Sequence, residues 1–332
     1  MVELKSADKQ SSKKAKKKRS KKGKTLQVVE FIAVYTLLVF CRITPLKIIH
    51  LISSLLGNLF YLLVSRRRTI AVDNLKHAYA GEKDDKEIRK IARMSCISFF
   101  LTFLEGSKFQ AALKSDSVQD DLRKASLALD ELFQKAKRIH DDYKGCIFVT
   151  PHIGNWELLP HVSSVVGIPL VVVVRPLDNI YLEKLIYKKR AGSGQVIIPK
   201  KNAMFTLQKT LQHGESIGML PDQSTMQGIS VDFFGRKATT TPVPAILSIS
   251  YKRPIVVVAC CRSSDGYSFE GIVSDPVLPG EYQSEKEEIF RLTEEVNKKM
   301  ELIIRKYPEQ YLWMHNRWKT YKHKKELLQE LH

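Results

Sequence analysis

Residues 150–157 of the chain read TPHIGNWE, and they follow directly on a short apolar run, GCIFV, at 145–149. A short run of this kind, rich in β-branched and aromatic residues, is typical of a buried strand. Pro151 and Gly154 then interrupt the chain, and an apolar helical pattern begins after them. The stretch therefore predicts a strand, a sharp turn and a helix, and reaction sites of α/β folds gather at such strand ends.

The spacing of His152 and Glu157 suits acid–base chemistry. His152 falls where the predicted strand ends, and Glu157 falls in the first turn of the predicted helix. Residues five apart do not face each other along one helix, but they can across a strand–turn–helix corner. A carboxylate bonded to one imidazole nitrogen prepares the other to take a proton from a hydroxyl. The alternative is that His152 caps the loop and Glu157 favours the helix dipole, and these residues alone leave both interpretations open.

The composition of the chain points to anionic partners and to a reducing compartment. The 332 residues include 54 Lys and Arg against 35 Asp and Glu, which gives a formal net charge of +19. Such a charge favours nucleic acid, anionic lipid or an acidic protein as the partner. The five cysteines are odd in number and lack the spacing of metal ligands, so we expect reduced thiols in an intracellular compartment.

The N-terminal part of the chain divides into a basic tail and an apolar anchor. Residues 1–24 are rich in lysine and should be disordered. Residues 25–68 form the predicted membrane anchor, with an apolar segment at 26–41 and an amphipathic helix at 46–64. Basic residues flank both ends, so the positive-inside rule does not orient a span. Three alternatives remain: a crossing at 26–41 with the tail outside, a monotopic anchor with both ends cytoplasmic, or an ordinary buried helix pair.

The region after the anchor, residues 69–325, is predicted to be one catalytic domain of the α/β class. Its first part reads as helices at 69–79, 85–110 and 118–140. After that, strands are expected at 145–149, 168–174, 195–198, 215–220, 254–261 and 267–273. The intervening helices are expected at 156–166, 179–190, 202–213, 240–251 and 284–306, the fourth of them capped by Thr239–Thr241. This alternation predicts a mixed, mainly parallel sheet wrapped by helices.

Further polar residues lie just beyond the predicted strands. Arg175 follows the strand at 168–174 and could hold a phosphate or carboxylate, or pair with a neighbour in its turn. Asp222 follows the strand at 215–220 and could position a substrate hydroxyl or assist the histidine, or bond its own backbone in a turn. The sequence lacks a nucleophile elbow, a Walker loop, a dinucleotide fingerprint and the HExxH metal motif. Direct, base-assisted transfer is therefore favoured over a covalent enzyme intermediate.

Several motifs together resemble the late acyltransferases of lipid A biosynthesis, the lauroyl/myristoyl transferase family, within the wider His-x4-Asp/Glu glycerolipid acyltransferase fold. The resemblance runs from the anchor to about Lys319. The motifs that carry it are RRR…I…NL at 66–75, His152 with Glu157, RPxDN at 175–179, PDQ at 221–223, FG…ATTT at 234–241 and PEQYxWxHxRxK at 308–319. The lysine-rich tail at 1–24 departs from the family pattern.

The resemblance implies an inner-membrane enzyme that faces the cytoplasm. It would move a fatty acyl chain from acyl carrier protein to a hydroxyl of a lipid A precursor or related glycolipid, with no metal and no cofactor beyond the acyl donor. By position, His152 would be the general base and Glu157 its partner. Substrate-binding positions would be Asn155, Arg175, Asp222 and Arg317. Membrane lipids are expected partners, and nucleic acid is not.

Other functions are compatible with parts of the sequence. The nearest alternative keeps the chemistry and changes the acceptor to a lysophospholipid or another glycolipid. A membrane-tethered nucleic-acid-binding protein would use the basic tail and the aromatic and basic residues at 307–319. An inactive relative with a scaffold role is the third alternative, although both residues of the central pair are present.

Overall fold

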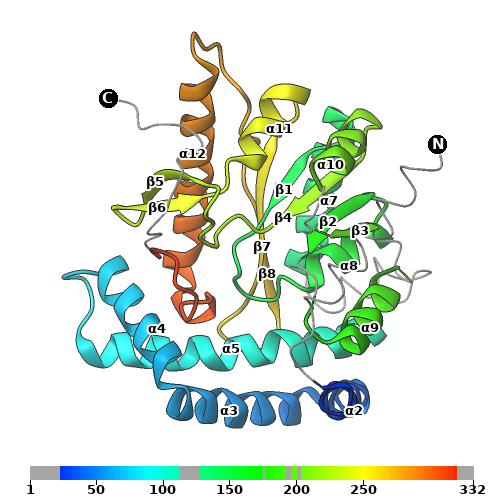
Figure 1. Cartoon of the computed structure of the whole chain (residues 1–332), viewed down its shortest axis with the longest axis vertical. Helices are drawn as coiled ribbons and strands as arrows, with labels where there is room; N and C mark the ends of the chain where they lie inside the picture. Colours follow the sequence, from blue (N-terminus) through cyan, green and yellow to red (C-terminus); the bar gives the residue numbers. More distant parts are fainter. Residues whose placement is uncertain (1–22, 113–126, 175–176, 192–195, 200–202, 320–332) are drawn as a thin grey trace.

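The fold is built on a six-stranded sheet with the strand order β3-β2-β4-β1-β7-β8 (Figure 1). The computed structural model describes residues 23–112, 127–174, 177–191, 196–199 and 203–319. The strands are β1 (Ile147–Val149), β2 (Leu170–Val174), β3 (Val196–Pro199), β4 (Ser216–Met219), β7 (Ile255–Arg262) and β8 (Phe269–Val273). All neighbours are parallel except β7 and β8. The predicted mixed, mainly parallel sheet is confirmed, and each strand begins and ends within two residues of its predicted position.

Helices cover both faces of this sheet. They are α2 (Lys24–Ile43), α3 (Leu46–Leu63), α4 (Ser65–Ala78), α5 (Asp85–Ala112), α7 (Leu127–Tyr143), α8 (Leu158–Val165), α9 (Ile180–Ala191), α10 (Ala203–Gln212), α11 (Val243–Tyr251) and α12 (Glu285–Lys306). In β1, Ile147 and Val149 point into one apolar core and Phe148 into another, which contains α7 and α8. Because both faces are buried here, β1 and β2 are wholly apolar and β7 is apolar up to Arg262. For the helix expected at 118–140, residues 118–126 lie outside the described residues.

A hairpin replaces part of one predicted helix. Strands β5 (Ile229–Phe233) and β6 (Arg236–Thr240) pair antiparallel, so Thr239 and Thr240 belong to a strand and not to a helix cap. The predicted capping was wrong for these two residues; the N-cap position of α11 is Pro242, and of the three threonines only the Thr241 hydroxyl accepts an N–H of the helix, that of Val243 at 3.5 Å. The cause is the two-residue turn at Phe234 and Gly235, whose φ angles of 54° and 71° match the right-handed twist of a tight hairpin.

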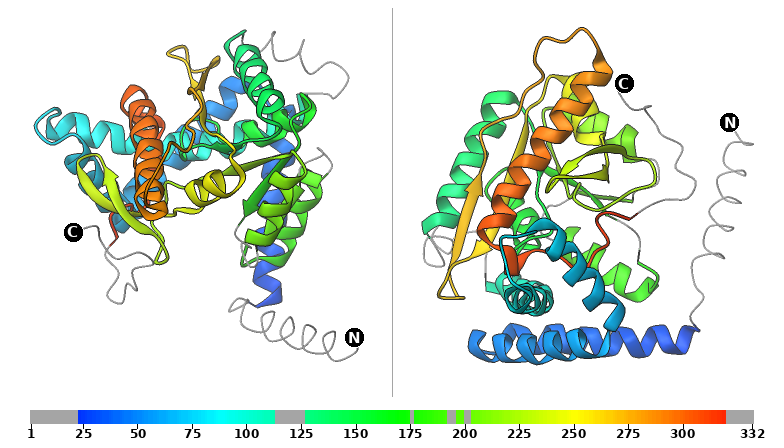
Figure 2. Two further views of the ribbon diagram at one scale, coloured as in Figure 1. Left: turned by 90° about the horizontal axis from the view of Figure 1, so that it is seen from above. Right: turned by 90° about the vertical axis from the view of Figure 1, so that its left-hand side faces the viewer.

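The N-terminal helices α2 and α3 form a layer beneath α5 (Figures 1 and 2). Both are long and apolar enough to cross a membrane by length and composition. α3 packs on α5 through a narrow face that includes Gly57, where an added Cβ would lie 2.5 Å from the Cα of Ile97. The pair is compatible with the predicted membrane-anchoring region.

Candidate active site

The site forms where β1 and β4 end side by side. His152 follows β1, and Asp222 follows β4, which pairs parallel with β1. One carboxylate oxygen of Asp222 lies 2.7 Å from Nδ1 of His152, and the other accepts the His152 backbone N–H at 2.9 Å. We assign the ring proton to Nδ1, since the carboxylate can only accept. Nε2 of His152 then carries the free lone pair and is the basic atom.

Asp222 is held as an anion inside the protein. Its side chain is only 2% exposed. Burial alone would raise the pKa of Asp222, but the charge and hydrogen bonds of His152 outweigh it, and the net pKa is below the ordinary value. The Tyr311 hydroxyl also bonds this carboxylate, and burial raises the pKa of that tyrosine well above its usual range. A carboxylate fixed from several sides can hold an imidazole in one orientation.

The open side of His152 is bordered by an amide and an aromatic ring. The amide nitrogen of Gln223 lies 3.3 Å from Nε2 of His152, and the Trp156 ring stacks edge-on at a centroid distance of 5.4 Å. The side chain of His152 is 17% exposed, so a substrate hydroxyl can approach it. A second imidazole, His315, is close enough to be influenced by Asp222; burial lowers the pKa of His315 to about 4, which keeps it neutral at physiological pH.

Glu157 does not occupy the predicted place beside the histidine nitrogen. The Nδ1 position belongs to Asp222, which is 70 residues away in the sequence. The loop from His152 runs across β7 instead of turning a tight corner: Gly154 has φ +59° and sits so close to β7 that an added Cβ would lie 2.0 Å from the Cys260 carbonyl oxygen. Glu157 precedes α8 and lies beside Gly106 of α5. In the structure Asp222 takes the position at Nδ1 that was predicted for Glu157, and a catalytic role for Glu157 stays a prediction.

A buried ion pair holds the loop that carries His152. Glu105 of α5 is fully buried, and its Oε2 accepts from Arg262 at the end of β7, with the shortest contact at 2.6 Å. Burial raises the pKa of Glu105, and the guanidinium of Arg262 opposes this. Asn155 donates to the same carboxylate at 3.4 Å, and Thr102 donates to the carbonyl of Gly154 at 2.7 Å. The network thus connects α5, β7 and the loop that carries His152.

The structure brings only some of the predicted substrate-binding residues to the open site. Asn155 is fully buried and its amide donates to Glu105, and its role in substrate binding stays a prediction. Arg317 is 1% exposed and donates hydrogen bonds to Thr239 and Thr240 of β6. In this arrangement its side chain is buried against the hairpin and is not open to solvent. Its charge still contributes to the low pKa of Asp222. Arg175 lies outside the described residues.

Four residues of the site were not predicted to act there. Gln223 and Tyr311 touch the central pair, and Glu105 and Arg262 support it. Gln223 could have been found because it directly follows Asp222 at a strand end. Glu105 and Arg262 had a weaker signal: each is a charged residue at the edge of an otherwise apolar segment.

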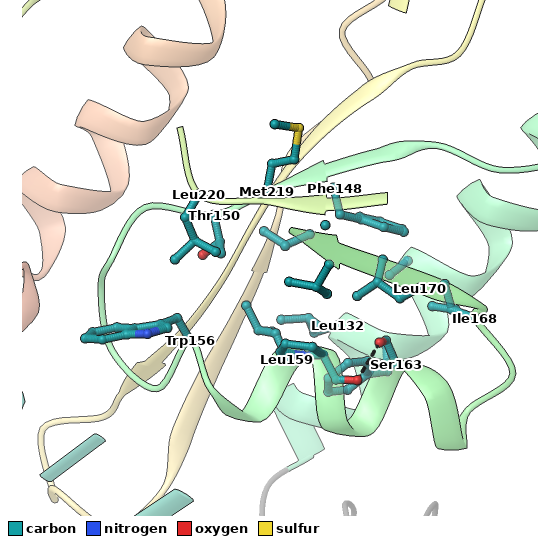
Figure 3. A pocket seen from close by; sticks show the side chains of 16 residues that line it. Leu132, Phe148, Thr150, Trp156, Leu159, Ser163, Ile168, Leu170, Met219 and Leu220 are labelled. Carbon is teal, nitrogen blue, oxygen red and sulfur yellow. Dashed lines mark hydrogen bonds between the residues drawn. The ribbon is translucent and has the colours of Figure 1, made fainter. Parts of the chain in front are cut away.

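An apolar cavity of about 50 Å³ opens beside the site, between the sheet and helices α7 and α8. Figure 3 shows Thr150 and Trp156 at one end and Ser163 and Ile168 at the other. The wall on the side of the sheet is formed by side chains of β1, β2 and β7. The backbone of Gly218 in β4 completes it. Trp156 lines this cavity and also packs edge-on against the His152 ring, so one side chain separates the cavity from the histidine.

Comparison with known proteins identifies the family of the chain. A lipid A biosynthesis acyltransferase of Haemophilus influenzae is 29% identical over 53% of this chain and 56% of its own length. The lipid A biosynthesis palmitoleoyltransferase of Escherichia coli is 28% identical over 55% of this chain and 59% of its own length, and the lauroyltransferase is 28% identical over 46% and 49%. These alignments span about half the length of the curated relatives. The family model of bacterial lipid A biosynthesis acyltransferases, however, matches residues 16–320, and the chain therefore belongs to that family.

Proposed function

We propose that this protein transfers a fatty acyl chain from acyl carrier protein to a hydroxyl of a lipid A precursor. The observation that carries the proposal is the His152–Asp222 pair, which contacts the cavity-lining Trp156, in a chain of the lipid A acyltransferase family. The relatives named as palmitoleoyl- and lauroyltransferases support an acyl group as the transferred unit. The family membership also supports a place at the inner membrane with the catalytic domain in the cytoplasm.

The proposed reaction needs one base and no enzyme-bound acyl group. His152 Nε2 removes the proton of the acceptor hydroxyl while its oxygen attacks the thioester carbonyl. The tetrahedral intermediate then expels the thiolate, which takes the proton back from the imidazolium. Asp222 stabilises that imidazolium, because its carboxylate accepts the Nδ1 proton at 2.7 Å. The Gln223 amide, which lies 3.3 Å from Nε2, must give way to the acceptor hydroxyl.

The cavity beside His152 is proposed to receive the acyl chain. Its lining is almost entirely apolar. At about 50 Å³ it is smaller than the ~300–1,000 Å³ of typical ligand sites. A bound chain would therefore have to displace side chains of α7 and α8 from the sheet.

Gly218 should influence the length of the transferred chain. An added Cβ at this residue would lie 3.2 Å from Leu170 and 3.3 Å from Val172, within the wall of the cavity. Gly218→Ala is expected to shift the preference toward shorter acyl donors, by about fourfold for each methylene that no longer fits. The measurement is a competition between donors of different chain length. Gly280→Ala, where the nearest atom is 4.0 Å away, is the matched control and should leave the preference unchanged. An unchanged preference in Gly218→Ala would contradict this assignment of the cavity.

The substrate assignment is tested with two donors and two acceptors. Membranes containing the protein are given acyl carrier protein or coenzyme A thioesters, with either a tetra-acylated lipid A precursor or a lysophospholipid. We expect product with the acyl carrier protein donor and the lipid A precursor. Product on the lysophospholipid alone would assign the other acceptor class. Transfer from coenzyme A at an equal rate would remove the carrier protein from the proposal.

A further inference from the structure

The two apolar helices α2 and α3 lie along the surface of the catalytic domain, and helices that cross a membrane would not need to do so. In Figure 1, α3 runs along the lower edge of the molecule and α2 is seen end-on beside it. In the right-hand view of Figure 2, both lie in a single layer below α5. Their axes therefore share one plane along the surface of the catalytic domain. A pair of helices that crosses a bilayer instead leaves the domain and extends for about 30 Å through lipid.

The first turns of α2 are bonded to the catalytic domain. Asn179 caps α9 by accepting the backbone N–H groups of Tyr181 and Leu182 at 3.0 and 3.2 Å. The amide of the same side chain donates to the Gln27 carbonyl at 2.8 Å and to the Glu30 carboxylate at 3.2 Å. Asn179 is 5% exposed and Gln27 is 3% exposed. The one acidic residue of α2 is thus used to bind the segment that follows β2.

The last turns of α2 are bonded to the same domain. The Ser107 hydroxyl donates to the carbonyl of Leu38 at 3.1 Å, and the ammonium of Lys108 donates to the carbonyl of Thr44 at 2.9 Å. Between them, Cys41 is fully buried. A helix of 20 residues is about 30 Å long. Since the catalytic domain holds both ends of this length, α2 lies flat against it.

The helix α3 turns its apolar face away from the protein. Its buried residues are Ile49, Ser53 and Gly57, which form the small face against α5. Large side chains at helical spacing are exposed on the other side: Ile48, Leu51, Leu55, Leu59 and Leu62. Residues of α2 continue this surface, including Val29, Ile32, Phe40 and Ile43. A soluble helix shows the opposite pattern, and an apolar surface of this extent indicates contact with lipid or another protein.

We propose that α2 and α3 form a platform that lies in one leaflet of an anionic phospholipid bilayer, with neither helix crossing it. The charges around the platform favour this partner. Lys24 begins α2, Arg42 and Lys47 lie at the junction of the two helices, and Arg66 follows α3; all four side chains are exposed. Basic residues around an apolar face bind anionic head groups while the face enters the acyl region. If the proposed function holds, the acceptor lipid would reach the site from the same leaflet.

The platform is tested directly by finding the side of the membrane from which single introduced cysteines can be labelled. The five natural cysteines are buried, so a membrane-impermeant maleimide should label mainly an introduced cysteine. The test positions are Lys24→Cys, Arg42→Cys and Ser65→Cys, and Lys298→Cys on α12 is the reference for the catalytic domain. In sealed inverted and right-side-out vesicles, all four should react from the same side. If Lys24→Cys and Arg42→Cys react from opposite sides of the membrane, α2 crosses it. If Arg42→Cys and Ser65→Cys react from opposite sides, α3 crosses it. This readout does not depend on enzymatic activity.

A charge on the platform should weaken binding to vesicles. Leu51 of α3 and Leu302 of α12 are both 69% exposed, which makes them a matched pair. With vesicles of phosphatidylethanolamine and phosphatidylglycerol, Leu51→Glu is expected to lower the partition coefficient by about tenfold or more, because a leucine leaves the apolar region. Leu302→Glu should bind like the parent protein. Equal binding of both variants would contradict the platform.

Discussion

Replacing His152 by alanine is expected to lower the rate of acyl transfer by about 10²–10⁴-fold, which is the usual contribution of a positioned general base. The Nε2 atom of this residue is the basic atom, because the Asp222 carboxylate occupies the other ring nitrogen. The measurement is the initial rate of product formation on a lipid A precursor, at equal amounts of membrane-bound protein.

A companion variant separates loss of chemistry from loss of fold. Alanine at position 152 leaves the buried carboxylate of Asp222 without its imidazole, which can destabilise the protein. In His152→Asn, the shorter amide can still donate to this carboxylate but is no base. We expect this variant to be as inactive as the alanine form while retaining more of the parent thermal stability. A rate within tenfold of the parent in a folded variant would contradict the role of His152 as the base.

Arg262→Ala should cause the largest loss of stability. The side chain is 5% exposed, and its guanidinium donates to Glu105, Ser98 and Thr102. Removing one partner of a buried ion pair leaves an uncompensated charge, at a cost of about 3–5 kcal/mol in the free energy of unfolding. For a chain of this size we expect the Tm to fall by roughly 10 °C. Lys76→Ala breaks an exposed pair with Asp85 and is the control, with an expected cost of at most about 1 kcal/mol.

The stability of the Arg262→Ala variant should also depend on pH. Burial raises the pKa of Glu105, and the opposing charge of Arg262 is absent in the variant. A carboxyl group with a raised pKa in the folded state binds more protons there than in the unfolded state. Its stabilising contribution is therefore present at low pH and is lost as the pH rises through the folded pKa. Thermal denaturation should show a larger deficit at pH 8 than at pH 5, because the loss begins just above the ordinary glutamate pKa of about 4.3. A deficit that is equal at both pH values would mean that Glu105 is not the uncompensated group.

The sequence predicted the sheet well because its strands have strong local patterns. The buried strands β1, β2, β4 and β7 are continuous apolar runs followed by turn residues. The hairpin of β5 and β6 was missed because its second strand, RKATT, contains threonines that are also common helix caps. The deciding feature was the turn at Phe234, a non-glycine residue with positive φ. Such a conformation is rare for phenylalanine, so the sequence offers little warning of it.

The site was predicted in part, and the difference lies in long-range pairing. His152 and Asp222 were each placed at the carboxyl end of a strand, which the structure confirms. That these two ends are neighbours depends on β4 pairing with β1, and no local pattern encodes the strand order. Glu157 looked like the partner because it is close in sequence. The loop instead passes over β7 at Gly154, where only glycine fits, and this close approach depends on tertiary packing.

Comparing Asp222→Asn with Glu157→Gln tests most directly whether the His152–Asp222 pair is the catalytic base. Both substitutions remove a negative charge and keep the size of the side chain. The structure places Asp222 on Nδ1 of His152, so Asp222→Asn should lower the rate of acyl transfer to a lipid A precursor at least about tenfold more than Glu157→Gln. A rate near that of the parent for Asp222→Asn, together with a strong loss for Glu157→Gln, would contradict the account and return the orienting role to Glu157.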